Sequence, residues 1–99
     1  MNITAEEAKQ IMDSQEGYII LDVRTQEEYD QGHIPGAIEI SREEIVENAE
    51  EVRTDKDQLI LVYCRSGRRS KIAAEALVEL GYTNIKEFGG IIDWPYEVE

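Results

Sequence analysis

The chain has 99 residues, of which 41% are hydrophobic, and its formal net charge is −12. This length and apolar content predict one domain spanning residues 1–99 with a buried core. The acidic balance argues against general binding to nucleic acid or to an anionic membrane. The single cysteine excludes a disulfide within the chain, and one cysteine with one histidine makes a zinc site unfavourable.

The chain begins with MNITAEEAKQ, which lacks the basic stretch followed by an apolar run that is typical of a signal peptide. No apolar run approaches the roughly 20 residues that a membrane-spanning helix needs. A small secreted domain often relies on disulfides, so the lone cysteine favours a reducing compartment. We therefore expect a cytoplasmic protein without a membrane span.

The first half of the chain predicts strands and helices in alternation. Ile3 begins a short strand, and Thr4-Ala-Glu-Glu7 has the capping-box spacing that opens a helix. The apolar run at residues 18–23 (YIILDV) is typical of a strand that is covered on both faces. A second capping box, Thr25-Gln-Glu-Glu28, opens a short helix that Gly32 is expected to end.

The second half repeats this alternation. A weak strand at residues 37–40 precedes a third capping box, Ser41-Arg-Glu-Glu44, and a second apolar run follows at residues 59–64 (LILVYC). The last helix is expected to end at Gly81 and to be followed by a weak strand at residues 84–88. Its predicted apolar face consists of Ile72, Ala73, Ala76, Leu77 and Leu80. Strands alternating with helices predict an α/β domain with a mostly parallel sheet.

The segment that precedes and begins the last predicted helix lacks the residues that usually start a helix. It reads CRSGRRS, with no capping box and no acidic residue, although a helix N-terminus favours negative charge. Four of the ten basic residues follow the cysteine within seven positions: Arg65, Arg68, Arg69 and Lys71. Local inconsistency of this kind is typical of functional sites, so we expect an anion to occupy this turn.

The anion can be the thiolate of Cys64 itself. Cys64 ends a predicted strand, and ligands of parallel sheets bind beyond the carboxyl ends of the strands. Loop N–H groups, the helix dipole and nearby guanidinium groups all favour the ionised thiol, and Gly67 permits the tight turn. The alternative is that Cys64 is an inert core residue and that the basic run is a solvated surface patch.

Four segments together resemble the rhodanese-like sulfurtransferase family. The loop Cys64-Arg-Ser-Gly-Arg-Arg-Ser70 resembles the family's active-site loop. The other segments are Leu21-Asp-Val-Arg24 with Glu28-Tyr29, Gly32-His-Ile-Pro-Gly-Ala37, and Phe88-Gly-Gly90 with Trp94. They occur in the family's order and cover nearly the whole chain. The resemblance implies a single rhodanese-like domain with a five-stranded, mostly parallel sheet flanked by helices.

The same resemblance implies a reaction and a set of site residues. Cys64 would take a sulfane sulfur from a small anionic donor such as thiosulfate, become a persulfide, and pass the sulfur to cyanide or to a thiol, including a protein thiol. No metal and no cofactor is implied. The substrate-binding residues would be those of the loop: Arg65, Ser66, Gly67, Arg68, Arg69 and Ser70. Among these, Arg69 matches a family arginine that we expect to bind the donor, with Arg65 as the second choice.

The remaining motif residues are interpreted as structural. Asp22 and Arg24 are expected to hold neighbouring loops through ion pairs, such as Arg24 with Glu28. His33 lies in a predicted turn, which favours a structural role over that of a general base. The aromatic residues Phe88 and Trp94 are expected in the core, and Pro95 should end any helix after Asp93.

Two rival functions remain open. Phosphatases and arsenate reductases of related fold use a Cys-x5-Arg loop, whereas here the sixth position after Cys64 is Ser70 and the arginine comes one position earlier. The other rival is a sulfur-relay or regulatory protein-binding module with little free turnover. Retention of Cys64 in an intact basic loop argues against a purely regulatory module but leaves sulfur relay to a protein partner open.

Overall fold

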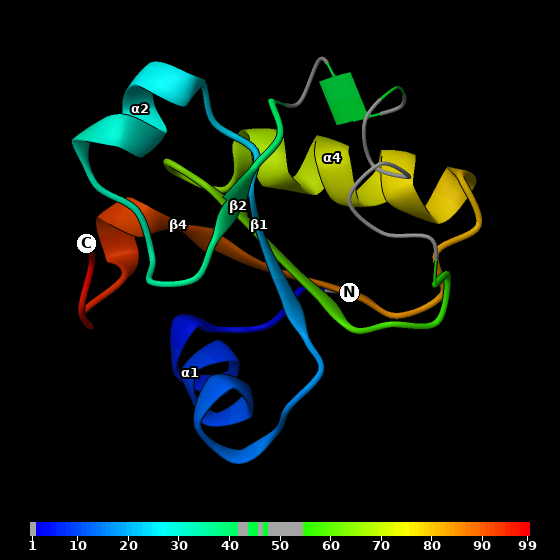
Figure 1. Cartoon of the computed structure of the whole chain (residues 1–99), viewed down its shortest axis with the longest axis horizontal. Coiled ribbons are helices and arrows are strands. Elements are labelled where there is room, and N and C mark those ends of the chain that lie inside the picture. Colours follow the sequence, from blue (N-terminus) through cyan, green and yellow to red (C-terminus); the bar gives the residue numbers. More distant parts are fainter. Residues whose placement is uncertain (1, 42–43, 46, 48–54) are drawn as a thin grey trace.

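The computed structural model describes residues 2–41, 44–45, 47 and 55–99. A parallel sheet forms its middle layer, with helix α4 (Arg68–Glu79) on one face and helix α1 (Ala5–Ser14) on the other (Figure 1). The described strands are β1 (Ile19–Asp22), β2 (Ile38–Glu39), β3 (Ile60–Cys64) and β4 (Ile85–Gly90). They pair in the order β2-β1-β3-β4, and every pairing is parallel. This arrangement confirms the predicted α/β class.

The predicted count of five strands is not confirmed. Among the described residues the sheet has four strands, and the N-terminal segment adds one isolated parallel bridge between Asn2 and Glu87. The amide of Ile3 donates to the carbonyl of Glu87 at 2.8 Å. Thr4 is already the N-cap of α1, so the segment enters its helix before it can pair further.

Two of the three predicted capping boxes are confirmed. The Oγ1 atoms of Thr4 and Thr25 accept hydrogen bonds from the amides of Glu7 and Glu28, and both glutamates accept from the N-cap amides in return. Helix α2 (Gln26–Gln31) ends at Gly32, as predicted. The helix predicted after Ser41 lies largely outside the described residues. Pro95 follows the short 3-10 helix η2 (Ile91–Asp93) and Trp94.

The side chains of β3 point alternately to the two faces of the sheet, and the core accordingly has two layers. Ile60, Val62 and Cys64 pack into the cluster that also holds Ala73 and Leu77 of α4. Leu61 and Tyr63 face the cluster that holds Ala8 of α1, together with Phe88 and Trp94 as predicted. Because side chains of a strand alternate between faces, Cys64 shares the face covered by α4.

The predicted apolar face of α4 needs one correction. Ile72 is 42% exposed, whereas Ala74 is 8% exposed and packs in the core. Ala73 and Leu77 are buried as predicted, and Ala76 and Leu80 pack against the same cluster. The burial pattern is therefore rotated by a small angle around the helix axis relative to the predicted one. None of the described helices is long and apolar enough to cross a membrane.

Candidate active site

The sulfur of Cys64 lies at the junction between β3 and α4. Cys64 is the last residue of β3 and is 1% exposed, and α4 begins four residues later at Arg68. Gly67 is the N-cap residue of α4, with φ of +107°, a left-handed conformation that favours glycine. This conformation turns the chain back, so that the amide of Gly67 donates to Cys64 Sγ at 3.0 Å.

Ser70 adds a hydroxyl group from the first turn of α4. Its side chain is fully buried, and its Oγ lies 3.5 Å from Cys64 Sγ. The same oxygen lies 2.9 Å from Oε1 of Glu87 on β4. The helix therefore brings a hydroxyl to the sulfur, while the adjacent strand brings a carboxylate to that hydroxyl.

These contacts lower the pKa of Cys64 below its ordinary value. Burial is the largest single influence and raises the pKa, because it disfavours the charged thiolate. Hydrogen bonding from the Ser70 hydroxyl and from the amides of Ser70, Gly67 and Ser66 lowers it and together outweighs burial. The direction agrees with the expectation from sequence, and the largest influences that lower the pKa of Cys64 are hydrogen bonds of the loop.

The Phe88-Gly-Gly90 segment packs directly against this loop. Gly90 pairs with Cys64 after an irregularity in the β3–β4 register. A Cβ atom on Gly90 would overlap the carbonyl oxygen of Arg65, and one on Gly67 would lie 3.3 Å from the Cα of Gly89. Because Gly67 and Gly90 have no side chain, the backbone of β4 can pack directly against the backbone of the loop.

The loop arginines differ in their partners. Arg69 donates two hydrogen bonds to the carboxylate of Glu28, at 2.6 and 2.9 Å. Arg65 and Arg68 are exposed, and neither has an ion-pair partner among the described residues. The predicted pair between Arg24 and Glu28 is wrong, because Glu28 reaches across to the loop and Arg24 binds Asp22.

Asp22 and Arg24 form a buried network beside the loop. Asp22 is fully buried and accepts from Nε and Nη2 of Arg24 at 2.9 and 2.6 Å, and from the hydroxyl of Tyr63 at 2.7 Å. Nη2 of Arg24 also donates to the carbonyl of Gly32, and the Tyr63 hydroxyl accepts from the amide of Ile34. The network ties the ends of β1 and β3 to the segment after α2.

His33 contacts residues away from the sulfur. Its ring stacks on Tyr29 with a centroid distance of 3.8 Å, and Nδ1 lies 3.0 Å from the carbonyl of Tyr29. Its Nε2 lies 3.6 Å from a carboxylate oxygen of Glu99. These contacts support the structural interpretation of His33.

A cleft of about 400 Å³ opens beside the loop. Arg65 and Glu28 contribute charged groups to its wall, and Ile91, Ile92 and Val98 contribute apolar ones. Ile92 is 58% exposed, and its amide donates to the carbonyl of Arg65. A substrate in this cleft would contact both the loop and an apolar surface. In the described part of the chain, no cluster of three or more His, Cys, Asp or Glu side chains is placed to hold a metal ion.

Replacing Glu28 by glutamine tests the ion pair with Arg69. The hydrogen bonds from Arg69 are the main reason that the pKa of Glu28 falls from 4.5 to about 2. Glutamine preserves the capping box of α2, so Glu28→Gln should lower the free energy of unfolding by about 1 kcal/mol at pH 7, since both side chains are partly exposed.

The sign of the pH dependence follows from the lowered pKa. The ionised carboxylate stabilises the fold fully above pH 4.5, and this contribution is lost as the pH falls through 2. Urea unfolding at several pH values should therefore show the two proteins converging in acid. A difference that stays constant down to pH 2 would contradict the role of the pair.

Comparison with known proteins identifies the family of the chain. The model of the Rhodanese-like domain family matches residues 4–95, so the chain belongs to the rhodanese-like sulfurtransferase family. The chain is 42% identical over 73 residues to thiosulfate sulfurtransferase PspE of Escherichia coli (strain K12), covering 74% of this chain and 70% of that one. It is 39% identical over 98 residues to the putative sulfur carrier protein YrkF of Bacillus subtilis (strain 168). That match covers 98% of this chain but only 52% of YrkF, about half its length.

Solved structures show the same fold. A rhodanese with anions from E. coli superposes with a TM-score of 0.78 at 38% identity, covering 83% of this chain and 96% of that one. The rhodanese-like domain of the Anabaena protein Alr3790 gives a TM-score of 0.91 at 27% identity, covering 99% of this chain and 77% of the other. The family and the fold class predicted from sequence are thereby confirmed, and the named relatives support sulfurtransferase activity in general.

The structure brings most of the predicted site residues together and adds one that sequence reasoning missed. Residues 64–70 form the turn from β3 into α4, in which Gly67 and Ser70 reach the sulfur. Arg69 is directed to Glu28, and Arg65 and Arg68 are exposed. Glu87 was missed, although a signal was present. In the segment NIKEF it shares the strand face of Ile85, an inward position where a carboxylate is unexpected.

Proposed function

We propose that this protein transfers a sulfane sulfur from a donor such as thiosulfate to a thiophilic acceptor, such as cyanide or a thiol, through a persulfide on Cys64. The observation that carries the proposal is the amide of Gly67 lying 3.0 Å from Cys64 Sγ, at the start of α4. This contact and the lowered pKa favour the thiolate, which is the nucleophilic form. We further propose that residues 1–99 act as one domain in the cytoplasm, where a free thiol stays reduced.

The proposed reaction has two half-reactions. The Cys64 thiolate attacks the outer sulfur of thiosulfate, a new S–S bond forms, and sulfite leaves with the electron pair of the broken S–S bond. Cyanide then attacks the outer sulfur of the persulfide, thiocyanate leaves, and the thiolate is restored. Charge balances in each step, and neither a metal nor a cofactor is required. Ping-pong kinetics are expected.

The loop residues divide these tasks. The backbone amides of Ser66, Gly67 and Ser70 act on the Cys64 sulfur and form a nest that suits the charged outer sulfur of the persulfide. For the donor anion we propose Arg65 as the first contact, because it is exposed, adjacent to Cys64 and part of the cleft wall. Arg68 is a weaker candidate, and Arg69 contributes only if its pair with Glu28 opens.

Arg65→Ala should lower kcat/KM for thiosulfate by about ten- to a hundredfold, because a charged hydrogen bond is worth roughly 1.5–3 kcal/mol. The transfer of sulfur from the formed persulfide to cyanide should change little. Stopped-flow measurement of the two half-reactions separates these effects. Lys71→Ala is the matched control, since Lys71 is exposed and screened by solvent, and it should remain within about threefold of the wild type.

Arg69→Ala distinguishes the arginines. If it impairs the donor step more than Arg65→Ala does, Arg69 is the donor contact and must leave Glu28 when substrate binds. Equal losses in all three variants would indicate that the basic cluster acts only as a general field.

Mass spectrometry after addition of thiosulfate tests the proposed function directly. We expect the mass of one sulfur atom to be gained on Cys64 and lost again after cyanide is added. Because the chain has one cysteine, the modified site is unambiguous. A protein that binds thiosulfate without gaining sulfur would contradict the proposal.

A sulfur-relay role is the second candidate, and one observation favours it. The B. subtilis relative that matches nearly all of this chain is named a putative sulfur carrier protein. In a relay the persulfide would form in the same way, but its acceptor would be a protein thiol that docks at the cleft beside Arg65. Rapid loading by thiosulfate with slow discharge to cyanide and fast discharge to a protein thiol would favour the relay over free turnover.

A further inference from the structure

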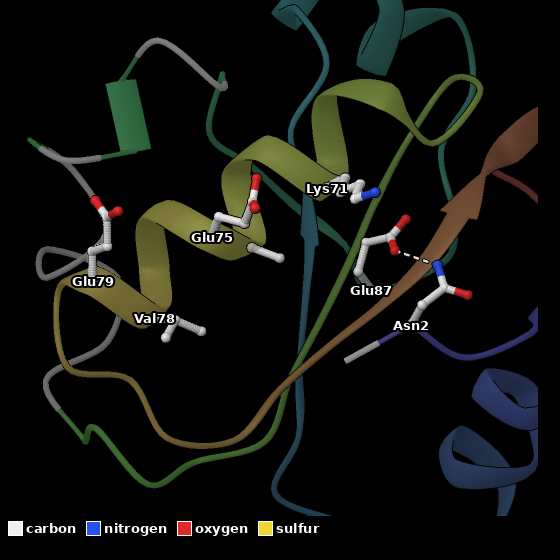
Figure 2. A pocket seen from close by; sticks show the side chains of 7 residues that line it. Asn2, Lys71, Glu75, Val78, Glu79 and Glu87 are labelled. Carbon is white, nitrogen blue, oxygen red and sulfur yellow. Dashed lines mark hydrogen bonds between the residues drawn. The ribbon is translucent and has the colours of Figure 1, made fainter.

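Glu87 is a buried carboxylate that the proposed reaction does not use. It lies on β4, is 5% exposed, and has no cation among its partners in the described part of the chain. Its Oε1 accepts from the amide of Gly89 at 3.0 Å and faces the Ser70 hydroxyl at 2.9 Å. Its Oε2 accepts a hydrogen bond from Nδ2 of Asn2 at 2.5 Å (Figure 2). Both residues line a cleft of about 570 Å³.

The hydroxyl of Ser70 has one hydrogen and several possible acceptors. Its Oγ lies 2.9 Å from Glu87 Oε1, 3.1 Å from the carbonyl of Gly67, 3.2 Å from the carbonyl of Gly89 and 3.5 Å from Cys64 Sγ. The carboxylate is the nearest of these, and hydrogen bonds to ionised acceptors are roughly twice as strong as neutral ones. When Cys64 is a thiol, the hydrogen of Ser70 therefore points to Glu87.

The thiolate and the persulfide make different demands on that hydrogen. A thiolate carries its charge on Sγ and competes with Glu87 for the Ser70 hydroxyl. In a persulfide the charge lies on the added outer sulfur, and Sγ becomes a neutral, weak acceptor. The hydroxyl can then remain on Glu87, and the two negative charges lie further apart.

We propose that Glu87 is a positioning residue that competes with the Cys64 sulfur for the single hydrogen of Ser70 and thereby favours the persulfide over the free thiolate. The inference rests on the proposed function, because it concerns the two sulfur states of that reaction. Glu87 makes the thiolate more reactive toward a sulfur donor. In the persulfide form, the Ser70 hydroxyl can stay hydrogen-bonded to Glu87 without leaving a charged Sγ unpaired.

The other charged groups around the sulfur do not play this role. Asp22 on β1 is held by Arg24 and Tyr63, and Glu28 on α2 is held by Arg69 of α4. Arg65 and Arg68 of the loop are exposed to solvent, and Lys71 of α4 and Lys86 of β4 have no described contact with the sulfur or with Ser70. Glu87 is the described carboxylate that reaches Cys64 through a shared hydroxyl.

Glu87→Gln tests the competition, because glutamine keeps the shape but removes the charge. The ionisation of Cys64 can be followed by the ultraviolet absorbance of the thiolate against pH, with Cys64→Ser subtracted as the tyrosine background. We expect the midpoint of Glu87→Gln to lie about 1 pH unit below that of the wild type. A merely structural role predicts the opposite, because a loosened loop lets the thiol return toward its ordinary value of about 8.5.

Two further variants control this measurement. Glu75→Gln removes a carboxylate from the same cleft that has no described contact with Ser70, and it should leave the midpoint unchanged (Figure 2). Ser70→Ala should raise the midpoint, because it removes a hydrogen bond that favours the thiolate. In the Ser70→Ala background, Glu87→Gln should have less than half of its effect, since the two residues act through one hydrogen bond.

The persulfide itself provides the second readout. At a pH above the wild-type midpoint, where free Cys64 is the thiolate, the equilibrium with fixed thiosulfate and sulfite should hold about tenfold less persulfide relative to free Cys64 in Glu87→Gln, corresponding to about 1 pH unit in the midpoint. An unchanged or raised midpoint in Glu87→Gln, or an unchanged loading ratio, would overturn the proposal. The midpoint needs no sulfur transfer, so a failure of the proposed function is recognised separately by the absence of loading in the wild type.

Discussion

Cys64→Ser is expected to abolish sulfur transfer from thiosulfate to cyanide, lowering the rate by at least about a thousandfold. The serine hydroxyl ionises only at far higher pH than the thiol, and it cannot form the sulfur–sulfur bond on which both half-reactions depend. Serine fits the site, because its oxygen can still accept from the amide of Gly67. The free energy of unfolding should therefore change by only about 1 kcal/mol.

Steady-state transfer and urea unfolding on the same preparation measure the two parts of this prediction. A matched control is Ser14→Ala, which changes an exposed serine at the end of α1, outside the loop. It should keep activity within a few-fold of the wild type. Because the chain has no second cysteine, transfer near the wild-type rate in Cys64→Ser would leave no thiol to carry the sulfur and would refute the persulfide mechanism.

The elements of the fold that sequence predicts well are those set by local chemistry. The runs at residues 18–23 and 59–64 become β1 and β3, the two inner strands of the described sheet, because a strand covered on both faces must be apolar throughout. The boxes at Thr4 and Thr25 begin their helices, since each satisfies amides of its own first turn. The strand predicted at Ile3 is reduced to one bridge with β4, because Thr4 already begins α1.

The loop around Cys64 was also predictable, because its residues are consecutive and its exceptions to local rules lie together. The ion-pair partners of the charged residues in and around the loop were not predictable. Arg24 and Glu28 are four residues apart, which favoured a local pair, but Asp22 at the buried end of β1 binds Arg24 instead. Glu28 is then available to Arg69, which is 41 positions away in the sequence. Glu87 reaches Ser70 across 17 positions, and only the packing of β4 against the loop brings them together.

Removing one partner of the buried Asp22–Arg24 pair should strongly destabilise the loop end of the sheet. Asp22→Asn removes the negative charge and leaves the guanidinium of Arg24, which is 6% exposed, uncompensated. It also presents an amide donor to groups that themselves donate. Breaking one side of a buried ion pair typically costs about 3–5 kcal/mol, and we expect a loss in that range in urea unfolding at pH 7.

Tyr63→Phe is the matched control for this prediction. It removes the neutral donor to Asp22 and leaves the ion pair intact, so the free energy of unfolding should fall by only about 1–2 kcal/mol.

Nη2 of Arg24 also donates to the carbonyl of Gly32, next to the helix that carries Glu28. Asp22→Asn should therefore loosen the Glu28–Arg69 pair as well, and its stability loss should overlap that of Glu28→Gln rather than add to it. A loss no larger than that of Tyr63→Phe would mean that the charge on Arg24 finds another partner, and the network would then be ordinary hydrogen bonding rather than an ion pair that holds the site.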